Sequence, residues 1–256
     1  MEQLLENKTI LIAGAGGLLG AKLVAAVLAQ GAKVIGADLH VEAMRERLVE
    51  NGVNVTQDEL TLTELDITSE ASVKALFAQF CEIDGAVNTT YPRNKTYGKH
   101  FYDVTLESFN ENLSLHLGST FLFTQQCAAL FRRQLRPLSL INISSIYGVI
   151  APKFDIYSGT HMTTPVEYVA IKSAIQHLSK YVVAYVKDSR FRINCVSPGG
   201  IMDQQPETFL NEYKKNTNGH GMLDAKDVVG AILFLLSDMS RYITGQNIIV
   251  DDGFSN

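Results

Sequence analysis

The sequence predicts a single doubly wound α/β domain on a mostly parallel, seven-stranded sheet. Short apolar runs alternate with segments whose apolar residues recur at helical spacing. Within the runs, apolar residues occupy nearly every position, as in strands that helices cover on both faces. A chain of 256 residues is long for one domain but ordinary for an α/β unit, so we expect one domain over residues 1–256.

The first half of the chain carries four expected strands, at residues 9–13, 33–38, 60–66 and 85–88. Helical spacing predicts helices between them, at residues 18–28, 41–50 and 72–80. Ser69 lies just ahead of the last of these helices, where a serine hydroxyl can cap the helix start. Strands and helices thus alternate, which is the pattern of parallel strands joined by crossover connections.

The second half continues the alternation, with strands expected at residues 138–143, 192–196 and 247–250. Helices are expected at residues 106–133 and, after Pro165, at residues 166–186. Long irregular stretches remain at residues 89–103, 147–164 and 199–221. Ligands of doubly wound sheets bind beyond the carboxyl ends of the strands, so these stretches are candidate walls of a binding site.

Composition and charge exclude several classes of protein. The net charge of −5 provides no basic surface that would attract a nucleic acid. No apolar run approaches the ~18 residues of a membrane span, and no export signal is visible. Cys81, Cys127 and Cys195 lie far apart and match no metal-site spacing. We therefore expect a cytoplasmic protein without a structural metal, a membrane anchor or a nucleic-acid partner.

A glycine-rich loop follows the first expected strand and opens the first expected helix. Glycine permits a sharp turn and lets the backbone approach a pyrophosphate, whose charge the free N–H groups of the helix start stabilise. The same glycines could instead serve only a tight turn between strand and helix. In the binding interpretation, the cofactor contacts of this loop are Gly14, Gly16, Gly17, Leu18, Leu19 and Gly20.

An acidic residue, Asp38, ends the second expected strand, about 20 residues beyond the loop. A carboxylate there can accept hydrogen bonds from a ribose 2′-hydroxyl, whereas it would repel a 2′-phosphate. No lysine or arginine lies within the loop or directly beside Asp38 to neutralise such a phosphate. The sequence therefore favours NAD(H) over NADP(H), although Asp38 could also simply cap the following helix.

Tyr168 and Lys172 lie four residues apart in an expected helix, one turn apart on the same face. A nearby cation favours the ionised form of a phenol and so lowers its pKa toward the range useful for proton transfer. The pair indicates acid/base chemistry. Taken singly, the same spacing also fits an aromatic side chain beside a solvated lysine.

The chain resembles the short-chain dehydrogenase/reductase family over nearly its whole length, from Thr9 to Phe254. The landmarks that carry the resemblance occur in the family's order: the glycine loop, Asp38, Asp66-Ile67, Asn142 to Ser145, Tyr168 with Lys172, Asn194 to Gly199, and Thr244 to Gly253. The resemblance implies a Rossmann-like fold, an oxidoreductase activity with a nicotinamide cofactor, and a homodimer or homotetramer.

The resemblance also assigns roles to individual residues. Tyr168 would exchange a proton with the substrate oxygen, and Ser145 would hydrogen-bond that oxygen. Lys172 would lower the pKa of Tyr168 and hold the nicotinamide ribose. Further cofactor contacts implied by the resemblance are Asp66, Ile67, Asn88, Thr89, Pro198, Gly199 and Ile201.

Three features depart from the family pattern. The glycine loop carries Leu18 where many relatives have glycine, and Tyr91 brings bulk to a segment where small residues are usual. The family's asparagine that holds a relay water falls on His116. An imidazole can itself relay protons near neutral pH, but His116 could equally be a buried histidine that fills space.

The interval between Ser145 and Tyr168 is longer than the resemblance implies, and the extra residues lie in residues 151–164. Their mixture of aromatic, polar and cationic side chains suits a sugar ring or a phosphate. We expect substrate contacts from Tyr91, Arg93, Tyr147, Lys153, Tyr157 and Gly200, with the cations as phosphate contacts.

At closer range, residues 92–105, 142–152 and 245–254 resemble the flagellin-modification and surface-glycan oxidoreductases. The implied small-molecule substrate is a phosphorylated or nucleotide-activated amino sugar. Two other functions stay open at this point. One is reduction of a 3-oxoacyl thioester or small ketone, and the other is a scaffold that binds dinucleotide without turnover.

Overall fold

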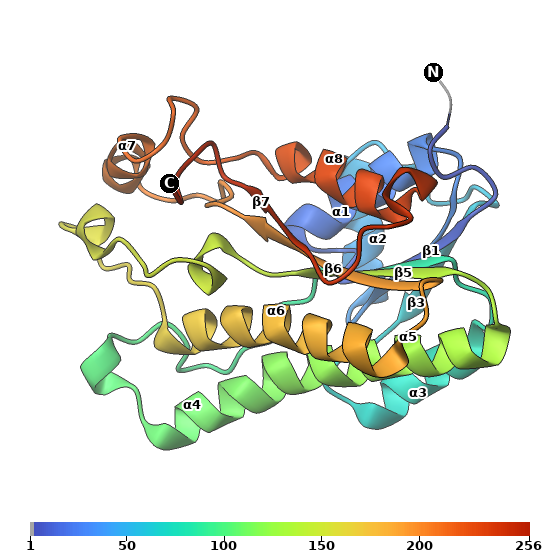
Figure 1. Cartoon of the computed structure of the whole chain (residues 1–256). Coiled ribbons are helices and arrows are strands. Elements are labelled where there is room, and N and C mark those ends of the chain that lie inside the picture. The colour runs from blue at the N-terminus through green and yellow to red at the C-terminus, as the bar shows by residue number, and fades with distance from the viewer. Residues whose placement is uncertain (1–2) are drawn as a thin grey trace.

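Seven parallel strands form one sheet in the order β3-β2-β1-β4-β5-β6-β7 (Figure 1). The computed structural model describes residues 3–256. The strands are β1 (Thr9–Ala13), β2 (Lys33–Asp38), β3 (Leu60–Glu64), β4 (Gly85–Asn88), β5 (Leu138–Ile143), β6 (Phe191–Pro198) and β7 (Asn247–Val250). All six neighbouring pairs are parallel, which confirms the doubly wound α/β fold. The chain order reverses between β1 and β4, where such sheets form their ligand crevice.

Helices cover both faces of the sheet. One face carries α1 (Leu18–Ala29), α2 (Val41–Glu50) and α8 (Ala225–Leu236), and the other carries α3 (Glu70–Gln79), α5 (Ser119–Gln134) and α6 (Val166–Val186) (Figure 1). Two shorter helices, α4 (Leu106–Asn112) and α7 (Glu207–Lys214), lie beyond the layers near the carboxyl ends of the strands. No helix within residues 3–256 is both long and apolar enough to cross a membrane.

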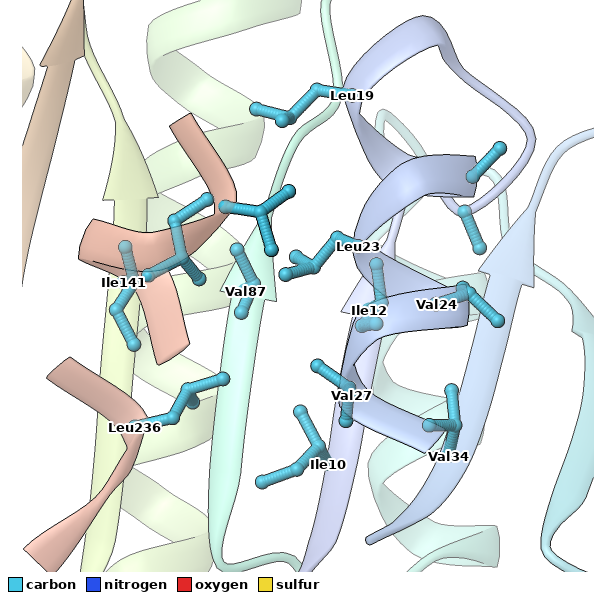
Figure 2. Packing of buried hydrophobic residues seen from close by; sticks show 14 of the residues in the cluster. Ile10, Ile12, Leu19, Leu23, Val24, Val27, Val34, Val87, Ile141 and Leu236 are labelled. Atoms are coloured by element: carbon cyan, nitrogen blue, oxygen red, sulfur yellow. The ribbon is translucent and has the colours of Figure 1, made fainter. Parts of the chain in front are cut away.

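The two-sided burial explains why the strands are apolar at nearly every position. Ile10 and Ile12 of β1 pack with Leu23 and Val27 of α1 (Figure 2), whereas Leu11 between them packs into the cluster on the opposite face. All of these side chains are fully buried. Burying each stabilises the fold by about 1.5–3 kcal/mol, so the central strands hold the sheet rigidly beneath the crevice.

The structure differs from the expected elements at a few places. The expected third strand ends at Glu64, which leaves Asp66 and Ile67 in the loop that follows. The expected helix at residues 106–133 is divided into α4 and α5 by a π-helical turn over Leu113–Gly118. Neither α7 nor α8 was expected, and α7 lies inside the stretch 199–221. Only two of its eight residues are buried, too few to show a helical pattern in the sequence.

Candidate active site

A cavity of about 960 Å³ lies beyond the carboxyl ends of the central strands. It is lined by residues from all three stretches expected as walls, together with the ends of β2, β5 and β6. Every residue predicted for the site lines the cavity except five: Gly16, Gly20, Asn88, His116 and Lys153. Residues spread over most of the chain thus converge on one place.

The glycine loop forms one end of the cavity and has no room for side chains. Gly14 adopts a positive φ of 83°, and a Cβ atom there would lie 2.7 Å from Thr89 Oγ1. A Cβ atom at Gly20 would lie 2.0 Å from the carbonyl oxygen of Gly14, so the first turn of α1 packs directly on the loop. Gly17 precedes α1 without any side-chain cap, which leaves the N–H groups of the helix start free for an anion.

Asp38 both holds this loop and faces the cavity. Its Oδ2 accepts a hydrogen bond from Gly16 N at 2.9 Å, while its Oδ1 takes part in no hydrogen bond within residues 3–256. The cap position of α2 belongs to His40, so the alternative role of Asp38 as a helix cap is wrong. The cationic residues that line the cavity, Arg93 and Lys172, belong to its other end.

Beside Asp38, the loop after β3 presents Ile67 to the cavity. Asp66 Oδ1 accepts hydrogen bonds from Thr68 N at 2.9 Å and from Thr68 Oγ1 at 2.6 Å. Because the Asp66 side chain is occupied in this turn, it fixes the position of Ile67, which is buried but lines the cavity. Asp66 and Ile67 therefore lie where a flat adenine ring could rest on an apolar side chain.

The segment after β4 shapes the middle of the cavity. Thr89 Oγ1 donates a hydrogen bond to Ala13 O at 2.8 Å and so ties β4 to the glycine loop. Asn88 is buried outside the cavity lining, and its Oδ1 accepts hydrogen bonds from Thr90 N and Thr90 Oγ1. Asn88 was expected as a direct cofactor contact, but its side chain supports the neighbouring turn instead.

Ser145, Tyr168 and Lys172 meet at the other end of the cavity. Ser145 follows β5, whereas Tyr168 and Lys172 lie one turn apart near the start of α6. Ser144 Oγ donates to Lys172 O at 2.8 Å, which fixes the end of β5 against α6. Ser145 Oγ accepts a hydrogen bond from Tyr147 N at 3.2 Å, so its own hydroxyl hydrogen is available to a ligand.

Burial controls the charge state of this group. Lys172 is buried, its Nζ donates to Ile143 O at 2.8 Å, and burial lowers its pKa to about 7. Burial also raises the pKa of Tyr168, while the Ser145 hydroxyl acts in the opposite direction. We expected Lys172 to lower the pKa of Tyr168. The pKa of Tyr168 is raised instead, because desolvation of the phenol is the largest effect on it and the lysine, whose Nζ lies 5.5 Å from its ring centroid, is only partly protonated at pH 7.

His116 lies in the π-helical turn, directly behind Lys172. Its Nε2 is 3.5 Å from Lys172 Nζ, and burial, with a smaller effect of Lys172, lowers the pKa of the imidazole well below 6.5. The imidazole is therefore neutral at pH 7 and can accept a proton. Its carbonyl oxygen accepts hydrogen bonds from Ser119 Oγ and Thr120 Oγ1.

Tyr91 lies at the centre of an aromatic cluster around these residues. Its ring meets the Tyr168 ring edge-on at 5.7 Å and the His116 ring at 5.2 Å between centroids. The guanidinium of Arg93 lies 5.0 Å from the Tyr91 ring centroid. The Tyr91 hydroxyl is hydrogen-bonded to the hydroxyl of Tyr97, a residue that the sequence analysis did not single out.

The substrate end of the cavity is walled by further tyrosines. Thr164 Oγ1 donates to the Tyr157 hydroxyl at 2.6 Å, and Tyr157 donates onward to Tyr147 at 3.3 Å. Lys153 does not face the cavity: its Nζ donates to Phe254 O at 2.7 Å, so its expected role as a phosphate contact is wrong. Gly200 N donates to the hydroxyl of Tyr213, a cavity residue from α7 that the sequence did not reveal.

No group of three or more potential metal ligands occurs within the part of the chain that the structure describes. The site combines two groups of residues. A phenol, a hydroxyl, an ammonium and an imidazole lie at one end of the cavity, and a glycine cradle with a carboxylate lies at the other.

A family model described as enoyl-(acyl carrier protein) reductase matches residues 14–255. A post-translational flagellin modification protein A from Campylobacter coli is 39% identical over 259 residues, which cover 98% of this chain and 99% of the relative. The chain belongs to the short-chain dehydrogenase/reductase family.

Other members of the family show how widely its substrates range. A 7alpha-hydroxysteroid dehydrogenase from Bacteroides fragilis is 29% identical over 98% of this chain and 95% of its own length. Among solved structures, a short-chain dehydrogenase from Leptospira borgpetersenii with bound NAD+ superposes with a TM-score of 0.86 at 30% identity, covering 100% of this chain and 95% of that one. The family and its fold are thus shown, whereas the substrate differs from member to member.

Proposed function

We propose that this chain is an NAD(H)-dependent oxidoreductase acting on a hydroxyl or keto carbon of a phosphorylated or nucleotide-activated amino sugar, in surface-glycan biosynthesis of the flagellin-modification type. The observation that carries the chemistry is the convergence of Ser145, Tyr168 and Lys172 in the cavity that also holds the glycine loop and Asp38. The flagellin-modification relative, which matches nearly the whole chain, supports the substrate class.

The cavity fits a dinucleotide in size and in chemistry. The glycine cradle, which added Cβ atoms would fill, lets backbone N–H groups reach a pyrophosphate. Asp38 offers a carboxylate oxygen to an adenosine ribose, Ile67 an apolar surface to the adenine, and Lys172 an ammonium to the second ribose. When bound, the nicotinamide supplies or accepts the hydride. NAD+ bound to the Leptospira relative supports this cofactor.

Tyr168 serves as the acid in the direction of reduction. Its raised pKa keeps the phenol protonated at pH 7, so it can donate a hydrogen bond and then its proton to the substrate oxygen. Ser145 donates a second hydrogen bond to that oxygen from its free hydroxyl hydrogen. In the direction of oxidation, Tyr168 first gives up its own proton toward Lys172 and then takes the proton of the substrate hydroxyl.

We assign proton resupply to Lys172 and His116. With a pKa of about 7, Lys172 gains and loses a proton readily at neutral pH. The neutral imidazole of His116, 3.5 Å from Lys172 Nζ, has one N–H and one free nitrogen, so it can pass a proton toward Lys172 during reduction and away from it during oxidation. This role replaces that of the water-holding asparagine which the family resemblance places here.

The walls of the cavity favour a sugar that carries an anionic group. Tyr91, Tyr147 and Tyr157 line its substrate end, and aromatic rings with hydroxyl groups can pack on and hydrogen-bond a sugar ring. Arg93 lies on the Tyr91 ring and forms no ion pair within residues 3–256. Its guanidinium is thus available to a phosphate or carboxylate.

Absorbance-monitored interconversion of NAD+ and NADH tests the proposal across phosphorylated and nucleotide-linked amino sugars, with an acetoacetyl thioester as comparator. We expect turnover confined to the sugars. Turnover confined to the thioester would replace the sugar by an acyl substrate, an outcome that the matching reductase family model makes worth measuring. No turnover by a chain that still binds NADH would favour a non-catalytic scaffold.

We also propose a homo-oligomer in the cytoplasm. On α6, the rings of Tyr181 and Tyr185 stack on each other, and these two residues are 63% and 75% exposed. Phe121 on α5 is half exposed. Such an aromatic surface is typical of an interface between copies. Sedimentation should show a dimer or tetramer that Tyr181→Glu weakens.

All three cysteines are free, which suits a reducing compartment such as the cytoplasm.

A further inference from the structure

Helix α7 is held over the substrate end of the cavity mainly by two side chains. Phe209 and Tyr213 are its two buried residues, Leu210 is partly buried against the same cluster, and half of the helix is exposed. The Phe209 ring lies 5.1 Å from the ring of Tyr157, which belongs to the inserted segment 151–164. The helix and the inserted segment therefore form two walls of the cavity that touch each other through aromatic rings.

The second of these side chains joins a three-layer stack. The Tyr213 ring stacks on the Phe254 ring at 4.4 Å between centroids with an interplanar angle of 17°. On Phe254 lies Lys153 of the inserted segment, with its Nζ 4.5 Å from the ring centroid and donating to Phe254 O at 2.7 Å. Phe254 is fully buried. A cation, a phenyl ring and a phenol from three distant segments are thus packed in one column.

The column ends on the backbone that follows β6. The Tyr213 hydroxyl accepts a hydrogen bond from Gly200 N at 2.6 Å. A Cβ atom at Gly199 would lie 2.8 Å from that hydroxyl oxygen, and one at Gly200 would lie 3.0 Å from a ring carbon of Tyr213. The absence of side chains at these two glycines is what allows Tyr213 to seat against the Pro198–Gly200 edge of the cavity.

We infer that Lys153, Phe254 and Tyr213 form a latch that holds the inserted segment, α7 and the Gly199–Gly200 backbone as one unit. Neither Lys153 nor Phe254 lines the cavity, so both act as positioning residues for the walls around the substrate. The inference rests on the proposed function only in taking this end of the cavity as the substrate site. The latch itself is a coupling between the inserted segment and α7, which lie far apart in the chain.

Hydrogen exchange of the cofactor-free chain, followed by mass spectrometry, tests the coupling without any substrate. Lys153→Met removes the ammonium and keeps the chain length of the side chain. We expect it to speed exchange about fivefold in residues 207–214, although Lys153 does not contact α7 in the column directly. Tyr213→Phe should speed exchange by a similar factor across residues 151–164.

Two matched controls replace exposed residues far from the column: Lys33→Met and Tyr242→Phe, which should leave both segments unchanged. Phe254→Leu, which keeps a buried apolar side chain but removes the stack, should reproduce both effects if Lys153→Met proves too unstable to study. Lys153→Arg, which retains the cation, should exchange as the wild type does. Faster exchange confined to the substituted residue's own segment would overturn the latch.

An activity measurement separates the latch from the proposed function. With any carbonyl substrate that the chain turns over, Lys153→Met, which changes a residue outside the cavity lining, should raise KM about fivefold and leave the dissociation constant of NADH and kcat within about twofold. An unchanged KM with normal exchange would contradict the latch while leaving the proposed function intact. Absence of any turnover would contradict the proposed function and leave the exchange result standing.

Discussion

The two ends of the cavity are built from different parts of the chain. At the nucleotide end, backbone atoms do the positioning: Gly20 lies against Gly14, and Gly16 N binds Asp38. At the substrate end, side chains from distant segments pack on one another, as Phe254 does on Tyr213. The difference teaches that the nucleotide end tolerates almost no added atoms, whereas the substrate end can change its shape by exchanging side chains.

The largest effect is expected at the substrate end, at Tyr168. Tyr168→Phe removes the phenol hydroxyl that exchanges the proton and keeps the ring that packs against Tyr91. Turnover should fall about 10²- to 10⁴-fold, the usual contribution of a positioned acid/base, while NADH still binds. Steady-state rates and a fluorescence titration of NADH measure both quantities. Undiminished turnover would remove Tyr168 from the mechanism.

At the nucleotide end, Gly20→Ala should weaken NADH binding about tenfold to hundredfold. The new Cβ atom would lie 2.0 Å from the Gly14 carbonyl oxygen, so the loop or the helix must move. Gly230→Ala in α8 is the matched control, because a Cβ atom there meets nothing within 4 Å and alanine favours a helix. Calorimetric titration of both variants with NADH measures the two dissociation constants. Equal affinities would mean that the loop is not a close-packed cradle.

A smaller change is expected from Asp38→Asn, which keeps the shape of the side chain and removes its charge. The preference for NADH over NADPH should fall about tenfold, because an amide no longer repels a 2′-phosphate. Dissociation constants for both cofactors provide the ratio. A ratio equal to that of the wild type would show that Asp38 acts only as a partner of Gly16 N.

Near pH 7 the smallest effect is on stability, where it shows as a slope with pH. The pKa of Lys172 is about 7 in the folded chain, below its ordinary value of 10.5 in an unfolded chain, so the unfolded chain binds more protons between these values. Stability relative to Lys172→Met should therefore rise with pH from about 7 to 10.5, by up to about 1.4 kcal/mol per pH unit. Urea unfolding of both chains at several pH values measures the difference, and a constant difference would contradict the lowered pKa.

The fold was largely predictable because its signals are local. A strand buried on both faces must be apolar at successive positions, and runs such as Thr9–Ala13 show this without knowledge of their neighbours. Helix α7 was not predicted because its packing depends mainly on Phe209 and Tyr213, whose ring partners lie far away in the chain. Helix α8 begins with a capping box at Asp224 and Asp227, which is a local signal that the sequence does carry.

The same distinction applies to the site. The glycine loop, Asp38, and the pair Tyr168 and Lys172 follow from spacing within one turn or one strand-to-helix connection. The Lys153 contact with Phe254 joins residues about 100 positions apart, and spacing says nothing of such a contact. The pKa of Tyr168 was predicted in the wrong direction, because burial of both partners depends on the packed structure and outweighs the local charge.

Hydride transfer itself is the most direct test of the account. The chain would be incubated with NADH carrying deuterium at nicotinamide C4, on the transferred face, and with keto forms of phosphorylated and nucleotide-linked amino sugars. We predict one deuterium at the new carbinol carbon of a sugar, formed by the wild type and lost in Tyr168→Phe. Deuterium in no sugar, with NADH bound and the chain folded, would contradict the proposed oxidoreductase activity on activated sugars.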